Sequence, residues 1–300
     1  MTQDIREIAY INHEDVVALN FIHGNGPYVF RRHCRQGLRS HILEVLPRAD
    51  IERERSGLLI QGYRWFPKAR PVKMFRIFRT KLKTLETALD EIRRVKIVEH
   101  FLAPDFIAHS DEFVVDYQGP GGREPLLCGF QAYVEGEIVD PWSILDKEIF
   151  VRTLYDALRS RIDSRIEAGQ WIGQVQQKAA RFIHNVKEMI AHSGYVPDLA
   201  GIGNLVVAGS GDIKLVDINN ISKVRFDTAI HLDDRHYPVC DKSIEALFLI
   251  EEKMTGRSAN RHEPLYRTFL DPQRKKDVKA HEAAFYHQKA SGRGYPPLQR

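Results

Sequence analysis

The chain has 300 residues, of which 43% are hydrophobic and 28% are charged, and its formal net charge is +4. This length and composition allow a well-buried core in one two-lobed unit or in two domains. The three cysteines are widely spaced, which argues against a disulfide framework, and the N-terminus has charges where a signal peptide needs an apolar stretch. No window approaches a membrane span, so we expect a cytoplasmic protein.

Two elements with clear apolar patterns come first. The segment Pro71–Phe78 is predicted to form a strand, with Lys73 near its start. Apolar residues then recur at helical spacing from Leu85 to Leu102, which predicts a helix with Thr84 as its N-cap. Taken alone, Lys73 is equally compatible with an edge-strand lysine that discourages aggregation.

The middle of the chain is predicted to be mainly helical. Apolar residues at helical spacing over 149–166, and again over 171–190, indicate two helices, and Ser193-Gly194 ends the second. Before them, the cluster at 119–123 is predicted to be a turn between strands. The tail from Lys289 is rich in Gly and Pro, and we expect it to be frayed.

The stretch 195–220 is the most informative part of the chain. Apolar runs at 205–207 and 213–216 flank a short polar, glycine-rich link, which predicts a hairpin. Because a hairpin returns the chain on itself, Asn204 and Asp217 are expected side by side at one end of the paired strands. Their oxygens are hard donors suited to Mg²⁺. Taken alone, Asp217 is also explained as a turn residue that ends a strand.

This pattern resembles the catalytic core of the protein-kinase-like superfamily. In that family an Asp and an Asn on a catalytic loop precede a metal-binding Asp on the next strand. Asp198 lies six residues before Asn204, and Asp217 follows thirteen residues later. The resemblance implies that Asp198 is the catalytic base and that Asn204 and Asp217 bind Mg²⁺.

An earlier block resembles the phosphate-binding part of the same family. The strand at 71–78 looks like the one that carries the phosphate-binding lysine. The resemblance therefore makes Lys73 a ligand of the ATP α- and β-phosphates. Glu91 takes the place of the acid that pairs with this lysine, and Glu86 is the other candidate.

Two further blocks complete the resemblance. The segment 126–137 looks like the last strand of the N-lobe and the hinge, which implies that the backbone around Ala132 and Val134 binds the adenine edge. Gln131 then lies near the gatekeeper position. The segment 240–256 resembles a C-lobe helix that starts with a buried Asp. Asp241 takes its place and is expected to accept hydrogen bonds from the backbone of the catalytic loop.

The resemblance implies an α+β, two-lobed protein-kinase-like fold. Its N-lobe is an antiparallel sheet with one main helix, and its C-lobe is mostly helical and reduced. Residues 1–55 are then an N-terminal extension or the first strands of the N-lobe. Residues 56–137 form the N-lobe and hinge, and residues 138–300 form the C-lobe with the catalytic loop and the metal-binding hairpin.

The chain departs from the family pattern at several places, among them Ile218-Asn219, where the family has Phe-Gly after the metal-binding Asp. Pro197 precedes the catalytic Asp where the family usually has an Arg, so we expect no activation by loop phosphorylation. The gap between Asp198 and Asn204 is one residue longer than usual. Gly57 and Gly62 stand where the family has the glycine triplet of the phosphate-covering loop.

The first functional hypothesis is a kinase that transfers the γ-phosphoryl group of ATP, with Mg²⁺, to a hydroxyl of a protein or small molecule. The sequence does not identify the acceptor. The alternative is a catalytically weak or inactive pseudokinase that acts as a nucleotide-binding or scaffolding module. A basic RNA-binding protein is a third hypothesis that rests on charge alone.

Two remaining features have simpler explanations. Residues 64–96 include eleven Lys and Arg against three acids, a density that suits nucleic acid or an acidic membrane surface. Long basic side chains more often form a solvated face, so we do not expect a nucleic acid partner. Five zinc-type ligands lie within ten residues, in a spacing that matches no zinc signature. They are His231, Asp233, Asp234, His236 and Cys240.

Overall fold

The computed structural model describes residues 3–23, 26–37 and 39–290, and it shows a mixed α+β chain with an antiparallel sheet. The chain divides into two compact units. Unit 1 comprises Met1–Arg93 and His109–Tyr133, and unit 2 comprises Arg94–Ala108 and Val134–Arg300. The tail that the sequence predicts to be frayed falls, from residue 291 on, outside the part of the chain that the structure describes.

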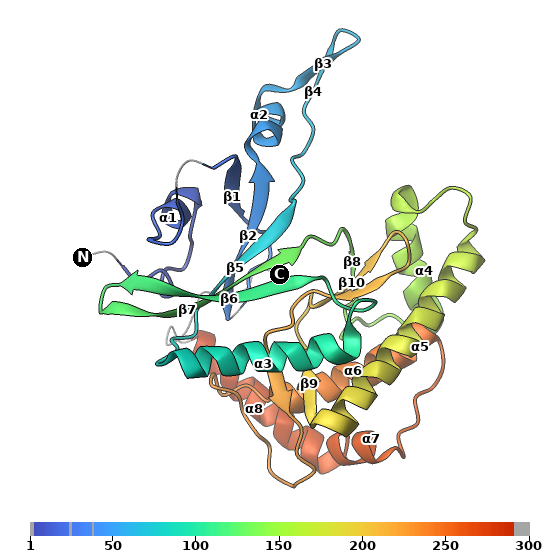
Figure 1. Cartoon of the computed structure of the whole chain (residues 1–300). Coiled ribbons are helices and arrows are strands. Elements are labelled where there is room, and N and C mark those ends of the chain that lie inside the picture. Colours follow the sequence, from blue (N-terminus) through green and yellow to red (C-terminus); the bar gives the residue numbers. More distant parts are fainter. Residues whose placement is uncertain (1–2, 24–25, 38, 291–300) are drawn as a thin grey trace. The chain divides into compact units, whose positions relative to one another are not determined.

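Unit 1 is built around a five-stranded antiparallel sheet (Figure 1). In their order across the sheet, the strands are β1 (Tyr28–Arg32), β2 (Ser40–Pro47), β5 (Lys73–Phe78), β7 (Gly122–Ala132) and β6 (Ser110–Gly119). Residues 28–47 thus supply two strands of this sheet. The predicted turn at 119–123 joins β6 to β7, and its closing pair is Gly119 with Gly122.

Unit 1 also contains elements outside this sheet. They are α1 (His13–Val17), α2 (Arg48–Ser56), the strands β3 (Leu58–Ile60) and β4 (Tyr63–Trp65), and the first part of α3 (Leu85–Leu102), which continues into unit 2. As predicted, Thr84 caps α3, because its Oγ1 accepts the N–H of Thr87 at 3.2 Å.

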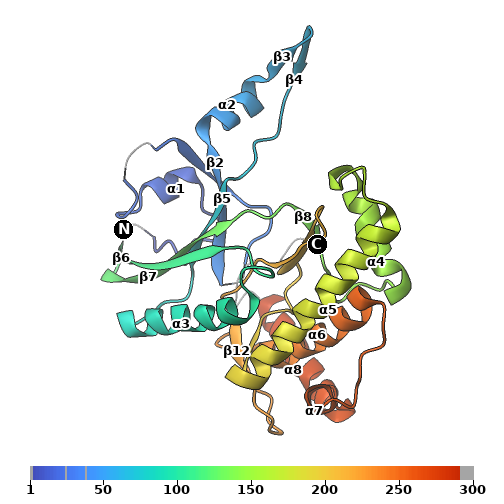
Figure 2. The ribbon, with the colours of Figure 1, turned by 45° about the vertical axis from the view of Figure 1, so that its right-hand side comes forward.

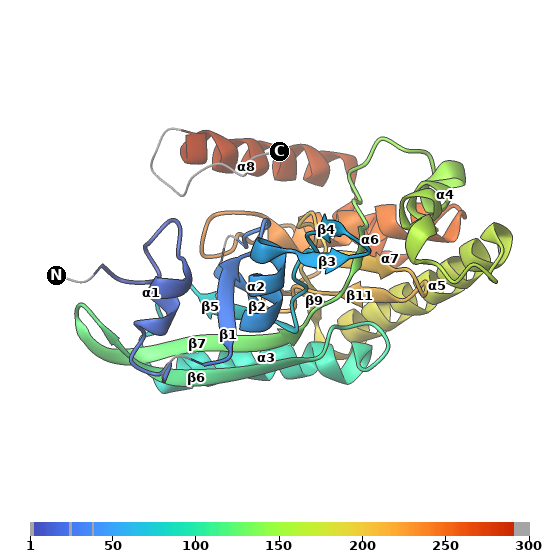
Figure 3. The ribbon, with the colours of Figure 1, turned by 90° about the horizontal axis from the view of Figure 1, so that it is seen from above.

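The two faces of the sheet bury different side chains. Phe75 on β5 packs in a cluster with Val16 of α1. Phe78, three residues later, packs with Ala88 and Ile92 of α3. Because side chains alternate along a strand, these two clusters lie on opposite faces. Figure 3 shows the first turns of α3 running beside β6 and β7, whose side chains join the second cluster.

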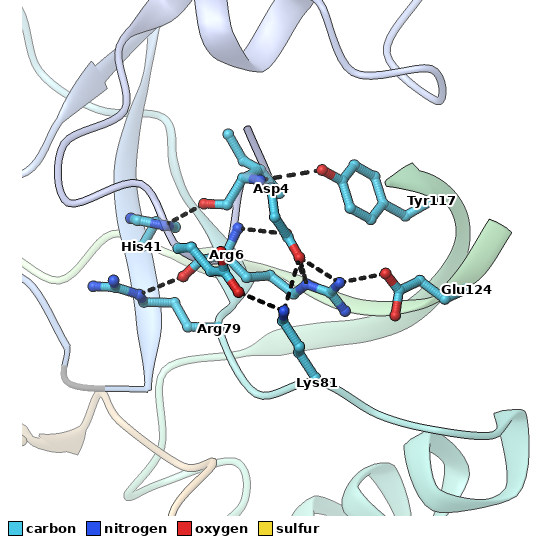
Figure 4. A network of polar contacts seen from close by, with 9 residues as sticks. Asp4, Arg6, His41, Arg79, Lys81, Tyr117 and Glu124 are labelled. Carbon is cyan, nitrogen blue, oxygen red and sulfur yellow. Dashed lines mark hydrogen bonds and ion pairs between the residues drawn. The ribbon is translucent and has the colours of Figure 1, made fainter. Parts of the chain in front are cut away.

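A buried polar network ties the N-terminal segment to this sheet (Figure 4). Arg6 is 1% exposed and forms ion pairs with Asp4, at 2.7 Å, and with Glu124. His41 on β2 lies with Nε2 2.9 Å from the carbonyl oxygen of Ile5. Burial lowers the pKa of His41 to about 4, so the neutral ring donates this hydrogen bond.

Unit 2 is mainly helical and carries short strands. In chain order, its elements after α3 are β8 (Gly136–Ile138), α4 (Lys147–Leu158), α5 (Ala168–Ser193), β9 (Tyr195–Pro197), β10 (Leu205–Ala208), β11 (Ile213–Leu215), β12 (Ile221–Lys223), α6 (Val239–Thr255), α7 (Pro264–Phe269) and α8 (Pro272–Ala290). Figure 2 shows α5 lying against α6. Trp171, Phe182 and Val186 of α5 are fully buried in the core of the unit.

One predicted helix is shorter in the structure. The helix expected over 149–166 ends at Leu158 and is followed by a single 3-10 turn at Arg159–Arg161. Asp163 then accepts the backbone N–H of Arg165 at 3.0 Å, and such local side-chain bonds compete with helix formation. The second helix ends as predicted, since Gly194 has a φ of 71°.

No helix in the described part of the chain combines the length and the apolar character needed to cross a bilayer.

Candidate functional site

The predicted hairpin forms in unit 2 and brings two of the expected site residues together. β10 pairs with β11 in antiparallel fashion, with Leu205 opposite Leu215. One position farther, the N–H of Val216 donates to the carbonyl oxygen of Asn204 at 2.8 Å. Asn204 and Asp217 therefore lie at the same end of the ribbon, as the sequence pattern predicts.

A second strand pair brings Asp198 to the same place. β9 pairs with β12, and Pro197 lies opposite Ile221. The next residues on each strand, Asp198 and Asn220, are joined by a hydrogen bond from Nδ2 to Oδ2 at 3.0 Å. Sequence reasoning missed Asn220. The available signal was the Asn pair at 219–220, just after Asp217, and its significance depends on the β9–β12 register.

The carboxylate of Asp198 is half-buried and partly satisfied by its own loop. Its Oδ1 accepts the backbone N–H of Ala200 at 3.0 Å and of Gly201 at 3.2 Å. Burial and the negative charge of Asp217 nevertheless raise the pKa of Asp198 to about 6, against the effect of these hydrogen bonds. The raised pKa makes Asp198 a stronger base than an ordinary aspartate while it remains mainly ionised at neutral pH.

The glycines of the loop fix the Asn204 side chain. Its Nδ2 donates to the backbone oxygen of Asp198 at 2.9 Å, so Oδ1 remains as the acceptor for a cation. A Cβ on Gly201 would lie 2.5 Å from that Nδ2, so a side chain there would push the Asn204 amide out of this position. Asn204 also closes a turn by donating its N–H to the Gly201 oxygen at 3.1 Å, and Gly203 has a φ of 97° within it. This turn brings the chain from Asp198 to the start of β10.

The loop is anchored by Ser243 and Trp142. The N–H of Leu199 donates to the hydroxyl of Ser243, a fully buried residue of α6, at 3.3 Å. Trp142 donates its Nε1–H to the oxygen of Ala200 at 2.9 Å. These two side chains hold the loop in the position in which Asp198 and Asn204 meet.

Asp241 does not play the role expected for it. It is 2% exposed at the start of α6, but its carboxylate binds the guanidinium of Arg274 on α8, with Nε and Oδ1 2.5 Å apart. Arg274 also donates to the backbone oxygens of Asp227 and Ala229. The positive charge of Arg274 thus neutralises this carboxylate, and Asp241 supports the segment at 227–229 in place of the loop that carries Asp198.

The predicted Lys73–Glu91 ion pair is not formed in this structure. Lys73 shares its face of β5 with Phe75, opposite the face that packs on α3. Its Nζ lies 3.9 Å from Oδ2 of Asp111 and 5.9 Å from the centroid of the Phe130 ring. Glu91 lies on α3 and is half-buried. The buried cation on the α3 side of β5 is Arg76, which the sequence reasoning did not consider.

Arg76 belongs to a charged group on the face of the unit 1 sheet that packs on α3. It is 2% exposed, and its Nη2 lies 2.7 Å from Oε1 of Glu112 on β6 and 2.8 Å from Oγ of Ser110. Gln131, the predicted gatekeeper, is buried on β7 on the same face, because its register partner is Ser110.

The predicted hinge lies where the chain passes from one unit to the other. The boundary falls between Tyr133 and Val134. The N–H of Ala132 is already used, since it donates to the oxygen of His109 at 2.8 Å. Ala132 therefore continues the β6–β7 ladder, and its N–H does not serve as the expected donor to adenine. The adenine contact of Val134 remains a prediction.

The side-chain donors around Asp198 are oxygens, the type of atom that Mg²⁺ prefers as a ligand. The described residues contain no group of three or more His, Cys, Asp and Glu arranged to hold a metal ion. His231 instead lies with Nε2 2.9 Å from Oδ2 of Asp227, and Cys240 is buried in α6. Asn204 and Asp217 offer one amide and one carboxylate oxygen at the same hairpin end, and a cation there would offset the repulsion between Asp217 and Asp198.

Comparison of the chain with protein-family models and with curated proteins gave no match.

Proposed function

We propose that the protein is an ATP- and Mg²⁺-dependent phosphotransferase that acts on a hydroxyl group. The carrying observation is that Asp198 and Asn204, from the loop between β9 and β10, and Asp217, which follows β11, converge at one end of the β10–β11 hairpin. A base, an amide and a second carboxylate in this arrangement are what phosphoryl transfer to an alcohol uses. The antiparallel sheet with one main helix in unit 1 and the helical unit 2 support a two-lobed, kinase-like arrangement.

The proposed roles follow from the contacts of each residue. Asn204 and Asp217 would hold Mg²⁺, which when bound neutralises charge on the phosphate oxygens. Asp198 accepts the proton of the acceptor hydroxyl while the oxygen of that hydroxyl attacks the γ-phosphorus. ADP leaves with the electron pair of the broken P–O bond. The hydrogen bonds from Asn220, Ala200 and Gly201 keep the carboxylate in one orientation during this transfer.

A second candidate function is a nucleotide-binding or scaffolding pseudokinase. The position of Lys73 favours it, because this lysine forms its ion pair with Asp111 on the face of the sheet opposite α3. A kinase of this kind needs a cation on the nucleotide phosphates. If no side chain supplies that charge, nucleotide binding would be weak and transfer slow.

The two candidates are separated by turnover of labelled ATP in the parent protein and in two matched variants. Asp217→Asn removes the negative charge of the proposed metal ligand, whereas Asp212→Asn makes the same change at the other end of the hairpin, where the carboxylate pairs with Lys178 at 2.6 Å. We expect Asp217→Asn to lower turnover by about 100-fold or more and Asp212→Asn to leave it unchanged. Stabilisation of the parent by Mg²⁺·ATP without turnover would favour the scaffold. Absence of both effects would refute a nucleotide site.

A further inference from the structure

A short hairpin in unit 1 presents apolar side chains to solvent. β3 and β4 form a separate two-stranded sheet, with Leu58 opposite Trp65 and Ile60 opposite Tyr63. Residues opposite each other in an antiparallel pair share a face, so these four side chains lie together. Their exposed fractions range from 36% to 81%. Figures 1 and 2 show this hairpin extending away from the five-stranded sheet of unit 1.

The hairpin is apolar toward its tip and basic toward its base. A two-residue turn forms the tip, with φ values of 49° at Gln61 and 82° at Gly62, and it carries no charge. Residues 57–72, between α2 and β5, contain three Lys and Arg and no acid. Lys68 is exposed beyond the end of β4. Arg64 donates from Nη1 to a backbone oxygen at the end of α2 at 3.0 Å, so its charge is directed to the base.

We propose that this hairpin docks the protein on an anionic membrane surface. A strand rises about 3.3 Å per residue, so a three-residue strand reaches about 10 Å. That length matches the roughly 5–10 Å to which interfacial segments enter the boundary between headgroups and acyl chains. Trp65 and Tyr63 are residue types that prefer this boundary. The basic side chains at the base of the hairpin are then level with the lipid phosphates.

The distribution of side chains favours a membrane over the other occupants. On the opposite face of the ribbon Leu59 lies across from Arg64, whose guanidinium is directed to the end of α2, and Leu59 is 72% exposed; Phe66, next to β4, is 56% exposed. A folded partner would cover one face, whereas a lipid boundary surrounds both. Pairing with a second copy would bring basic residues together. Single-stranded nucleic acid stacks on aromatic rings, and the aliphatic strand Leu58–Ile60 offers it no such platform.

Sedimentation of the whole 300-residue chain with lipid vesicles tests the proposal. We expect binding to vesicles of phosphatidylcholine mixed with phosphatidylglycerol, and about tenfold weaker binding to pure phosphatidylcholine. The double variant Ile60→Ser/Trp65→Ser should weaken binding to the anionic vesicles about tenfold. The control Tyr10→Ser/Ile144→Ser changes an exposed aromatic and an exposed Ile elsewhere, at 60% and 98% exposure, and should bind like the parent.

Tryptophan emission gives a second readout that locates the contact. Trp65 is 57% exposed, whereas Trp171 is buried, so insertion should shift the emission of the parent to shorter wavelength. Trp65→Phe should still sediment with anionic vesicles but lose this shift. The proposal is overturned if the parent does not bind anionic vesicles, or if the Ile60→Ser/Trp65→Ser variant binds them as the parent does. Self-association that depends on the hairpin, without vesicle binding, would assign the surface to a second copy and overturn the proposal as well.

Discussion

Replacing Asp198 by Asn should make the protein more stable at neutral pH while it abolishes turnover. The folded state raises the pKa of Asp198 from 3.8 to about 6, through burial and the charge of Asp217. A group whose pKa is raised on folding binds its proton more tightly in the folded state. Its contribution to stability is therefore present below pH 3.8 and is lost as the pH rises through 6.

The expected size of the effect follows from this shift. A rise of about two pKa units corresponds to about 3 kcal/mol of destabilisation by the ionised carboxylate above pH 6, at 1.36 kcal/mol per unit. The Asn side chain carries no charge, but its Nδ2 would face the Nδ2 of Asn220, and two N–H donors cannot bond to each other. The hydrogen bond from Asn220, about 1 kcal/mol, is therefore lost. Its Oδ1 still accepts the two backbone N–H groups of the loop. We expect a net gain of about 1–2 kcal/mol in the free energy of unfolding at pH 7.5.

Urea unfolding followed by tryptophan fluorescence measures this gain, because Trp142 and Trp171 both lie in unit 2. The gain should shrink as the pH falls below 6 and vanish near pH 4. Asp212→Asn is the matched control. Burial there is outweighed by hydrogen bonds from Lys178 and Ser210, which lower the pKa of Asp212, so its removal should bring no gain. Lower stability of Asp198→Asn at pH 7.5 would show that the carboxylate holds the loop together, and would refute the reasoning.

Three further predictions concern other parts of the chain. Burial lowers the pKa of His41 from 6.5 to about 4, so the free energy of unfolding in urea should fall by up to about 3 kcal/mol as the pH is lowered from 6.5 to 4. His41→Gln should weaken this pH dependence. Gly201→Ala should displace the Asn204 side chain and remove the thermal stabilisation of the protein by Mg²⁺·ATP. The control Gly173→Ala, whose added Cβ meets nothing within 4 Å, should retain this stabilisation. Equal stabilisation of the two variants by Mg²⁺·ATP would contradict the assigned geometry. Ser243→Ala leaves the backbone N–H of Leu199 without its acceptor, so we expect a loss of about 1 kcal/mol in the free energy of unfolding and a lower turnover. An unchanged turnover would show that Ser243 does not support the loop that carries Asp198.

Local patterns in the sequence predicted the elements that carry the site. Strong apolar periodicity gave α3 and α5, and the capping residue and the final glycine gave the N-terminus of α3 and the C-terminus of α5. The hairpin at 205–215 followed from two short apolar runs around a glycine-rich link. From that hairpin alone, the meeting of Asn204 and Asp217 could be deduced, because a strand pair has one register once its turn is fixed.

The sequence could not predict contacts that depend on pairing between distant segments. Asn220 meets Asp198 only because β9 pairs with β12 in one particular register. The face on which Lys73 lies depends on which of the two alternating sets of β5 residues packs on α3. Both sets contain apolar residues, so the sequence alone does not decide this. Asp241 has its expected burial but a different partner, since the charge that satisfies it comes from α8, 33 residues away in the chain.

The geometry around Asp198 argues for function independently of any family resemblance. A carboxylate that is half-buried beside a second carboxylate destabilises the fold at neutral pH, and a neutral amide in its place would avoid most of that cost. The loop nevertheless fixes it with two backbone N–H groups, a neighbouring amide and two glycines that admit no larger residue without strain. A site held so tightly in an unfavourable charge state is explained if a cation and a proton acceptor are needed there. The corresponding argument is weaker for Lys73, which is exposed and already paired, so a variant of this lysine distinguishes catalysis from scaffolding less sharply than a variant of Asp217.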